Sequence, residues 1–376
     1  MDKKDEADEI TKRVWSITLK EVQKGWLEGP LTKESIAEKY GPLFVASPRF
    51  GLVQSDKARP IDDMSISLVN SAFNAKFKLD LAGVDGIAVL CRSWIEAVAE
   101  GRSVTFTLST GATLRGFLHR TLTVVEAKTL AGRTLDLEAA YKQLLVKESA
   151  LWASVLAVPD DQGVQHFFVS HVLPFGASSA VYHFNMIARA LRIIGVRLFG
   201  LVWENYYDDY PQLHLAKSGD SSQQVAEEML ALLGWRYSVK ECKRLPMSNT
   251  FTALGVEFGL SKCPEDLVVV RNKMSRAEQI VAEVDAILAT GVFSSAAANS
   301  LRGRLQVAES QTFGRSIALR MRNCFKRASG ALPGALVDQA IREELEWAKK
   351  FVCTARPRLL RAGCLKRRCS FLPMLH

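Results

Sequence analysis

The segment Asn205-Tyr206-Tyr207-Asp208-Asp209-Tyr210 decides the predicted fold, because it places two adjacent aspartates in a tight turn between apolar strands. Adjacent carboxylates repel each other unless cations or hydrogen bonds offset their charge. Such a turn by itself is more often an exposed acidic loop than a metal site. Its interpretation therefore depends on the segments that precede it in the chain.

Two segments upstream of this turn also stand out in the sequence. Leu135-Asp136-Leu137 ends an apolar strand in an aspartate, and Tyr141 follows at the start of an expected helix. Residues 173–180, Leu-Pro-Phe-Gly-Ala-Ser-Ser-Ala, form a loop that leads into a second expected helix. The order of the three segments along the chain is more specific than any one of them.

Asp136, Asp208 and Asp209 together would form an oxygen-rich site. Carboxylate oxygens suit Mg²⁺ rather than Zn²⁺. Two such ions can activate an attacking hydroxyl and stabilise a leaving oxygen in phosphoryl transfer. Asp136 alone equally fits a helix N-cap, so the metal prediction rests on the three carboxylates together.

Strands and helices alternate irregularly along the chain, which favours an α+β fold over a parallel α/β sheet. The periodicity predicts a strand hairpin over 44–63 with its turn at 54–57, a helix that starts at Thr32, and mostly helices over 272–350. Further helices are predicted at 86–100, 138–146, 178–194 and 225–233, and strands at 104–108, 112–118, 121–125, 151–158, 166–173 and 253–258.

The net charge of +9 is concentrated in the C-terminal quarter of the 376 residues. Residues 301–370 contain sixteen basic and five acidic side chains, whereas the rest of the chain is near neutral. This distribution indicates a polyanion-binding surface, although a solvated helical face followed by a charged tail explains it equally well.

The composition excludes a disordered chain, since 48% of the residues are apolar and 24% are charged. The longest apolar stretch, 186–203, is interrupted by three arginines, so no membrane span is expected. The seven cysteines form no Cys-x-x-Cys pair, and the N-terminus has no apolar signal segment. We therefore expect a soluble intracellular protein, nuclear or cytoplasmic and not secreted.

These segments resemble the motifs of a reverse transcriptase of the retrotransposon kind, closest in pattern to gypsy-type and DIRS-type elements. Residues 135–141 resemble polymerase motif A, residues 173–180 resemble motif B, and residues 206–210 resemble the Tyr-x-Asp-Asp box of motif C. Further matches are a fingers strand at 58–63, motif D at 233–243 and the motif E primer grip at 253–256. The resemblance implies a right-hand polymerase with fingers, a palm built on an antiparallel sheet, and a helical thumb-like segment.

The resemblance implies which residues carry out the chemistry. Asp136, Asp208 and Asp209 would be catalytic and would ligate two Mg²⁺ ions, or Mn²⁺, with the carbonyl of Leu137 assisting. Lys243 would donate a proton to the pyrophosphate leaving group. A solvated position at the surface explains Lys243 as simply.

The nucleotide-binding residues follow from the same resemblance. Lys57 and Arg59 would reach the triphosphate, since basic side chains bind phosphate well. Tyr141 would lie under the sugar and exclude a 2′-hydroxyl. Phe175 would pack on the incoming nucleotide, and Gly176 would let the backbone approach it. A solvated turn residue at position 57 and an ordinary core aromatic at position 141 remain open alternatives.

The primer and template would contact two further regions. Leu254 and Gly255 would support the primer strand, although a buried strand segment fits them as well. Phosphate contacts, which carry affinity and not sequence choice, would come from Arg302, Arg304, Arg315, Arg320 and Arg322.

The implied organisation has five parts. They are an N-terminal helical extension (1–40), fingers (41–134) with an insertion at about 96–132, a palm (135–260), a helical thumb or connection-like segment (261–352) and a basic tail without regular structure (353–376). The basic residues of the insertion would face either nucleic acid or solvent.

We therefore expect an RNA-directed DNA polymerase domain of a mobile element, which transfers nucleotides to a primer 3′-hydroxyl. Its partners would be an RNA or DNA template-primer and dNTPs. An RNA-dependent RNA polymerase is the nearest enzymatic rival, but Tyr141 would block the ribose. The alternative from another class is a catalytically inactive descendant that binds nucleic acid or acts as a scaffold, and the loss of a carboxylate would be its signature.

Overall fold

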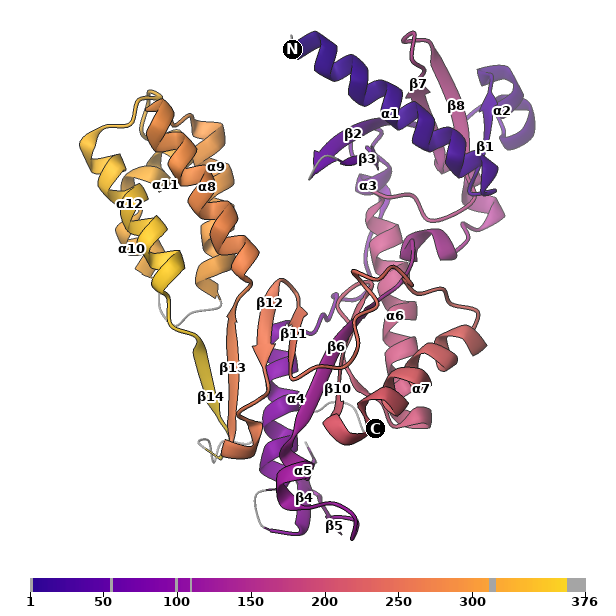
Figure 1. The fold of residues 1–376 in the computed structure, drawn as a ribbon. Helices are drawn as coiled ribbons and strands as arrows, with labels where there is room; N and C mark the ends of the chain where they lie inside the picture. The colour runs from indigo at the N-terminus through magenta and orange to yellow at the C-terminus, as the bar shows by residue number, and fades with distance from the viewer. Residues whose placement is uncertain (1–2, 55–56, 99–100, 109, 311–315, 364–376) are drawn as a thin grey trace. The chain divides into compact units, whose positions relative to one another are not determined.

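The computed structural model describes residues 3–54, 57–98, 101–108, 110–310 and 316–363 (Figure 1). The chain forms two compact units, each assembled from separate stretches of sequence. Unit 1 comprises Met1–Leu81, Asp136–Gly195 and Glu227–Ser238, and unit 2 comprises Ala82–Leu135, Val196–Ala226 and Val239–His376. The five-part organisation inferred from the sequence stays a prediction.

Unit 1 is built on a five-stranded sheet with the strand order β1-β8-β7-β2-β3. The pair β2 and β7 is parallel, and the other neighbours are antiparallel. Leu27, Leu156 and Phe168 of the sheet pack with Val14 and Met64 in its core. The strands are β1 (Leu27–Leu31), β2 (Ala46–Gln54), β3 (Lys57–Asp62), β7 (Val155–Pro159) and β8 (Gln165–Ser170).

The helices of unit 1 surround this sheet. Helix α1 (Lys3–Gln23) contacts β1, β2, β3 and β7. Helix α2 (Lys33–Tyr40) starts where the sequence predicts, because the side chain of Thr32 accepts a hydrogen bond from the amide of Ser35. The remaining elements are α3 (Val69–Ala72), the 3₁₀ turns η1 (Ala140–Gln143) and η2 (Glu148–Ala153), and α6 (Ser178–Phe199), whose last turn enters unit 2.

Two predictions for unit 1 have different outcomes. The hairpin over 44–63 is confirmed by the antiparallel pairing of β2 and β3, which extends to Gln54 and Lys57. Residues 55–56 of the predicted turn lie outside the described residues. The helix predicted over 138–146 is wrong, because only η1 forms there. Ala139 has a left-handed φ of 48°, and Leu145 pairs with Val172 in a β-bridge, so the chain leaves the helical path at both ends.

Unit 2 contains two larger sheets and a hairpin. One sheet has the order β6-β10-β9, and the other has the order β11-β12-β13-β14 with antiparallel neighbours. Ile87 and Cys91 of α4 pack against Phe251, Phe258 and Val268 of the second sheet. The strands are β4 (Ser103–Thr107), β5 (Thr113–Phe117), β6 (Leu130–Asp136), β9 (Val202–Trp203), β10 (Asp209–Leu215), β11 (Thr250–Ala253), β12 (Val256–Gly259), β13 (Leu267–Asn272) and β14 (Arg358–Arg361).

Helices complete unit 2, and five of them form a cluster with its own core. Ile280, Leu305, Ile317 and Leu345 are buried in that core, and the mostly helical prediction for 272–350 is confirmed. The cluster consists of α8 (Met274–Thr290), α9 (Ser295–Ser310), α10 (Ser316–Arg320), α11 (Arg322–Ala328) and α12 (Gln339–Thr354). The others are α4 (Val84–Ala97), α5 (Val124–Lys128), η3 (Ala216–Ser218), α7 (Gly219–Leu232), which ends in unit 1, and η4 (Cys263–Glu265).

Three predictions for unit 2 are corrected by the structure. The strand predicted at 121–125 is wrong, because Thr123 and Glu126 form a capping box that starts α5. The strand predicted at 253–258 is two strands joined by a tight turn. Residues 358–361 form β14, whereas the sequence predicts no regular structure there. Within the described part of the chain, no helix has the length and apolar character needed to cross a bilayer.

Candidate active site

The strands that carry the acidic motifs run antiparallel in one sheet. The amide of Ala216 donates to the carbonyl of Thr129 at 2.9 Å, and Nε of Arg133 donates to Oε1 of Gln212 at 3.0 Å. Residue numbers therefore rise along β6 as they fall along β10, which defines an antiparallel pair. The end of β6 and the start of β10 consequently lie at the same edge of this sheet.

That edge carries the carboxylates that the sequence singles out. Asp136 is the last residue of β6, and Asp209 is the first residue of β10. Asp208 precedes Asp209 at the tip of the β9-β10 turn. All three side chains are half-buried, so the interpretation as a freely exposed acidic loop is wrong. The catalytic role predicted for the three aspartates stays a prediction.

The turn itself has the geometry of a two-residue hairpin. Tyr206 and Asp209 exchange backbone hydrogen bonds of 2.9 and 3.1 Å, so Tyr207 and Asp208 form the tip. Tyr207 has a left-handed φ of 52°, a backbone conformation that a bulky side chain rarely adopts. Such backbone conformations cluster at functional sites.

A buried polar pair holds the register behind the carboxylates. Arg133 and Gln212 are 2% and 0% exposed. The amide nitrogen of the Gln212 side chain donates to the carbonyl and to the hydroxyl of Ser222, both at 2.8 Å. A slip of one residue would break all of these contacts and reverse the faces of the strand. Sequence reasoning missed this pair, although polar residues in two otherwise apolar strands were a visible signal.

The N-cap alternative for Asp136 is wrong. The 3₁₀ turn that follows has Ala139 at its N-cap and no side-chain cap hydrogen bond. The carbonyl of Asp136 accepts from the amide of Ser238 at 2.8 Å, and the buried Leu137 pairs with Tyr237 in a β-bridge. Asp136 therefore ends a strand and does not start a helix.

Carboxylates and main-chain carbonyls are the donor types that Mg²⁺ and Mn²⁺ accept. In the described parts of the chain, no three His, Cys, Asp or Glu side chains lie close enough to hold a metal ion together. The predicted metal site therefore stays a prediction.

Unit 1 holds the motif B loop in a fixed backbone conformation. Gly176 has a φ of 133°, and a Cβ atom added there would lie 2.0 Å from the carbonyl oxygen of Asp62. The side-chain Nδ2 of Asn70 donates to the carbonyl of Gly176 at 3.0 Å, and Oδ1 of Asn70 accepts from the backbone amide of Ser178 at 2.7 Å. Only glycine fits at position 176, because of its contact with Asp62. The predicted approach of this backbone to a nucleotide stays a prediction.

Two aromatic candidates for nucleotide binding meet in unit 1. The ring of Tyr141 lies edge-on to Phe175 with the centroids 6.0 Å apart, and it stacks on Phe184 at 4.7 Å. Phe175 is 46% exposed, so much of its ring is accessible. Tyr141 is half-buried, and its contact with the fully buried Phe184 also gives it a packing role.

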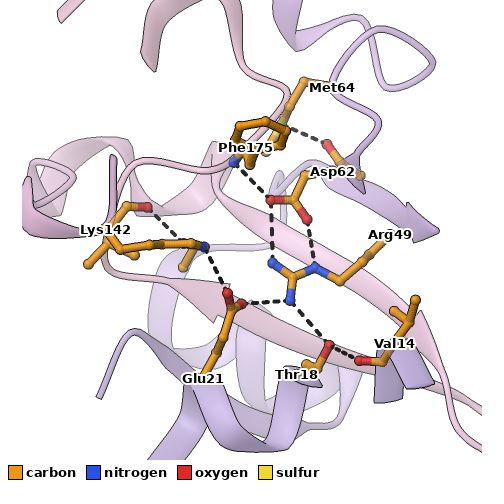
Figure 2. Close-up of polar contacts among 11 residues, drawn as sticks. Val14, Thr18, Glu21, Arg49, Asp62, Met64, Lys142 and Phe175 are labelled. Carbon is orange, nitrogen blue, oxygen red and sulfur yellow. Dashed lines mark hydrogen bonds and ion pairs between the residues drawn. The ribbon is translucent and has the colours of Figure 1, made fainter. Parts of the chain in front are cut away.

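A buried network of charged groups lies beneath this loop (Figure 2). Nε of Arg49 donates to Oδ1 of Asp62 at 2.7 Å, and Nη1 donates to Oε2 of Glu21 at 2.8 Å. Oε1 of Glu21 lies 3.4 Å from Nζ of Lys142. Asp62 accepts in turn from the amide of Phe175 at 3.1 Å. Two cations and two anions therefore alternate from the residue after Tyr141 to the motif B loop.

The network shifts the pKa values of its members. Burial raises the pKa of Glu21, but the charges of Arg49 and Lys142 outweigh burial and hold that pKa below 4.5. Burial lowers the pKa of Lys142, which Glu21 only partly offsets. Sequence reasoning missed Arg49 and Glu21. The predicted hairpin does place Arg49 opposite Asp62, and this opposite-charge pair was the available signal.

The fingers candidates lie on the β2-β3 hairpin. Arg59 is an exposed residue of β3, paired with Leu52 across the ladder. Lys57 begins β3, and its side chain lies outside the described part of the structure. An exposed position leaves Arg59 accessible to a phosphate group.

The remaining single candidates lie in unit 2. Lys243 is exposed in a turn, where its amide donates to the carbonyl of Lys240 at 2.8 Å. Leu254 and Gly255 are the two central residues of the β11-β12 turn, with φ values of 52° and 73°. Both lie in the left-handed region, which matches the twist of a hairpin. They therefore form a hairpin tip, and a buried strand interior is excluded.

The basic residues of the C-terminal quarter divide into paired and exposed groups. Nη1 of Arg304 pairs with Glu283 at 3.0 Å, and the guanidinium of Arg302 lies 5.7 Å from the ring centroid of Phe325. Arg320 and Arg322 are exposed, and Arg315 lies outside the described residues. Arg320 and Arg322 are thus the most accessible of the predicted phosphate contacts.

Two basic residues of the predicted insertion have structural roles. The guanidinium of Arg102 donates to the carbonyls of Leu118, His119 and Leu122 at 3.1 Å each. Lys128 is buried, and Nζ donates to Oδ1 of Asp266 at 2.6 Å. Lys128 is therefore too buried to face nucleic acid or solvent, whereas Arg102 is exposed and both alternatives stay open for it. Arg115 and Arg120 are exposed.

Comparison with solved structures identifies the fold. The chain is similar to a foamy viral protease-reverse transcriptase solved in complex with double-stranded DNA, with a TM-score of 0.55 and 13% sequence identity. The alignment covers 89% of this chain and 46% of the viral chain, so the chain spans about half the length of that protein. No family model and no curated protein matches the sequence. The chain has a reverse-transcriptase-like polymerase fold of the α+β class.

Proposed function

We propose that this protein is an RNA-directed DNA polymerase domain of a mobile element, similar in pattern to gypsy-type and DIRS-type retrotransposons. The observation that carries the proposal is the antiparallel register of β6 and β10, which puts Asp136 and Asp209 at one edge of a sheet in a reverse-transcriptase-like fold. The nearby Asp208 completes the acidic set. The two alternatives, an exposed acidic turn at Asp208-Asp209 and a helix cap at Asp136, do not explain why the two strands are paired in this register.

Asp136, Asp208 and Asp209 would hold Mg²⁺ or Mn²⁺, with the carbonyl of Leu137 assisting. A divalent cation bound there supplies charge stabilisation for phosphoryl transfer from a dNTP to a primer 3′-hydroxyl. In this proposal the carboxylates serve as metal ligands only. Lys243 is proposed as the proton donor to pyrophosphate.

The chain's own residues would bind and select the nucleotide. Arg59, and with it Lys57, would bind the triphosphate through charge-assisted hydrogen bonds. Phe175 would pack on the nucleotide with its exposed ring face. Tyr141 would exclude a 2′-hydroxyl, and its stacking on Phe184 would keep the ring from moving aside. The selection of deoxynucleotides is therefore steric.

A template-primer is the proposed macromolecular partner. The viral protein with the similar fold was solved with double-stranded DNA. Arg320 and Arg322 are exposed on α10 and α11, and Leu254 and Gly255 form the tip of a hairpin. Contacts of these arginines with phosphates would give binding that weakens with salt and has little sequence preference.

Primer extension on an RNA template with Mg²⁺ tests the proposal. The wild-type protein is expected to extend the primer with dNTPs and not with rNTPs, and Asp208→Ala is expected to abolish extension. Tyr141→Ala is expected to incorporate rNTPs as well. A wild-type protein that binds template-primer but never extends it would contradict the polymerase and favour an inactive nucleic-acid-binding descendant.

A further inference from the structure

We infer that Asp62 positions the Phe175-Gly176 loop, and that Glu21 makes this position depend on the N-terminal helix α1. The amide of Asp62 donates to the carbonyl of Phe175 at 2.9 Å, and the amide of Phe175 donates to Oδ2 of Asp62 at 3.1 Å. Asp62 therefore forms hydrogen bonds with Phe175 through both its backbone and its side chain. The consequence for nucleotide selection rests on the proposed function, whereas the geometry does not.

Close backbone contact with Asp62 fixes the position of the loop at Gly176. The α-carbon of Gly176 lies so close to the peptide of Asp62 that an added Cβ would meet the carbonyl oxygen at 2.0 Å. Backbone in such direct contact cannot adjust by rotating a side chain. The position of residue 62 therefore sets the position of residues 175 and 176.

Asp62 is itself held by a buried cation. Nε and Nη2 of Arg49 donate to its two carboxylate oxygens at 2.7 and 3.4 Å, and both side chains are almost fully buried. A buried carboxylate needs such a partner, because burial of an unpaired charge is very costly. The direction in which Asp62 points is thus fixed by Arg49.

Arg49 connects the loop to α1 (Figure 2). Nη1 donates to Glu21 at 2.8 Å and to the hydroxyl of Thr18 at 3.1 Å, and Thr18 donates to the carbonyl of Val14 at 2.9 Å. Glu21 also faces Lys142 at 3.4 Å. If Glu21 loses its charge, two buried cations share the single anion Asp62. Repulsion between Arg49 and Lys142 then displaces Arg49, and Asp62 moves with Arg49 because the two side chains are hydrogen-bonded.

The network reaches both aromatic candidates for nucleotide selection. Lys142 follows Tyr141 directly in the chain, and Asp62 holds the peptide of Phe175. The two rings lie edge-on to each other at 6.0 Å. A displaced network changes this spacing, and with it the affinity for the nucleotide. The displaced network does not include the carboxylates proposed to bind metal, Asp136, Asp208 and Asp209. Asp62, Arg49 and Glu21 are therefore positioning residues.

Amide hydrogen exchange of the protein without nucleotide tests the geometry. Glu21→Gln and Asp62→Asn are expected to speed exchange in the peptide over residues 172–178 by about tenfold, which corresponds to the loss of one hydrogen bond to a charged group. Glu9→Gln is the matched control, since Glu9 lies on the same helix in an exposed ion pair with Arg13. Exchange over residues 165–170 in β8 should stay unchanged, which separates a local loosening from general destabilisation.

Steady-state kinetics test the consequence. Glu21→Gln is expected to raise the KM for dNTPs about tenfold while kcat changes less than about twofold. A purely structural role would lower the amount of active protein and leave KM unchanged. If Glu21→Gln leaves both exchange and KM at wild-type values, the connection to α1 is wrong. If Asp62→Asn also leaves exchange unchanged, the whole inference fails. A wild-type protein without polymerase activity would overturn the proposed function alone, because the exchange result does not depend on catalysis.

Discussion

The substitution Gly176→Ala tests the contact between the motif B loop and β3. Gly176 has a φ of 133°, and the added Cβ would lie 2.0 Å from the carbonyl oxygen of Asp62, where ordinary contacts begin at 3.4 Å. The Asp62 peptide then has to move by roughly 1 Å or more, since neither backbone can rotate away. This displacement breaks the hydrogen bond between the amide of Asp62 and the carbonyl of Phe175.

Two contributions set the magnitude. An L-residue with this backbone conformation costs about 1–3 kcal/mol, and the lost hydrogen bond costs about 1 kcal/mol more. Gly163→Ala is the matched control in the same unit, because Gly163 has a φ of 84° and no atom within 4 Å of an added Cβ. We expect Gly176→Ala to lower the free energy of unfolding by about 3 kcal/mol and Gly163→Ala by about 1 kcal/mol.

Urea unfolding followed by circular dichroism measures the free energy of unfolding of both variants. Titration of dNTPs in primer extension measures the KM for dNTPs, which reports on the position of the loop. Gly176→Ala should also raise the KM for dNTPs, whereas Gly163→Ala should not. Equal destabilisation of the two variants, within about 0.5 kcal/mol, would refute the close approach of the loop to Asp62.

Two further predictions concern buried polar groups. Gln212→Leu should lower the free energy of unfolding by about 2–3 kcal/mol, because the buried Arg133 loses a hydrogen-bond acceptor. Urea unfolding of this variant beside the exposed control Gln306→Leu checks the prediction. Equal unfolding midpoints of the two variants would contradict it. Glu21 has a lowered folded-state pKa, so its stability contribution is present above pH 4.5 and is lost as the pH falls through that lowered pKa. The stability difference between wild type and Glu21→Gln should therefore stay constant above pH 4.5 and shrink as the pH falls below 4.5, and a constant difference at all pH values in urea unfolding would disagree with the assigned network.

Local signals in the sequence predict the elements that local chemistry determines. Thr32 marks a helix start because its hydroxyl accepts a hydrogen bond from the amide of Ser35, and the predicted hairpin strands pair as β2 and β3 up to Gln54 and Lys57. The Tyr-x-Asp-Asp segment predicts a tight turn between strands, and the structure has one. In each case the deciding contact lies within a few residues in the chain.

The predictions that fail depend on contacts from distant parts of the chain. The stretch 138–146 has helical periodicity, but Leu144 and Leu145 pair with residues around 172, and tertiary contact outweighs propensity. Lys128 looks like a surface cation, yet it is buried and its partner Asp266 lies 138 residues away. The buried ion pair of Arg49 with Glu21 of α1 likewise needs the packed structure before it can be recognised.

Single-nucleotide primer extension by Asp136→Asn tests the central claim most directly, because it removes the charge of the strand-end carboxylate of β6 that the proposal groups with Asp208 and Asp209. Asp161→Asn, an exposed aspartate in the β7-β8 turn, is the matched control. If the strand-end aspartates form one site, Asp136→Asn should lower kcat by at least about a hundredfold while the control keeps the wild-type rate. Wild-type incorporation by Asp136→Asn would contradict the assignment of these carboxylates to a polymerase site.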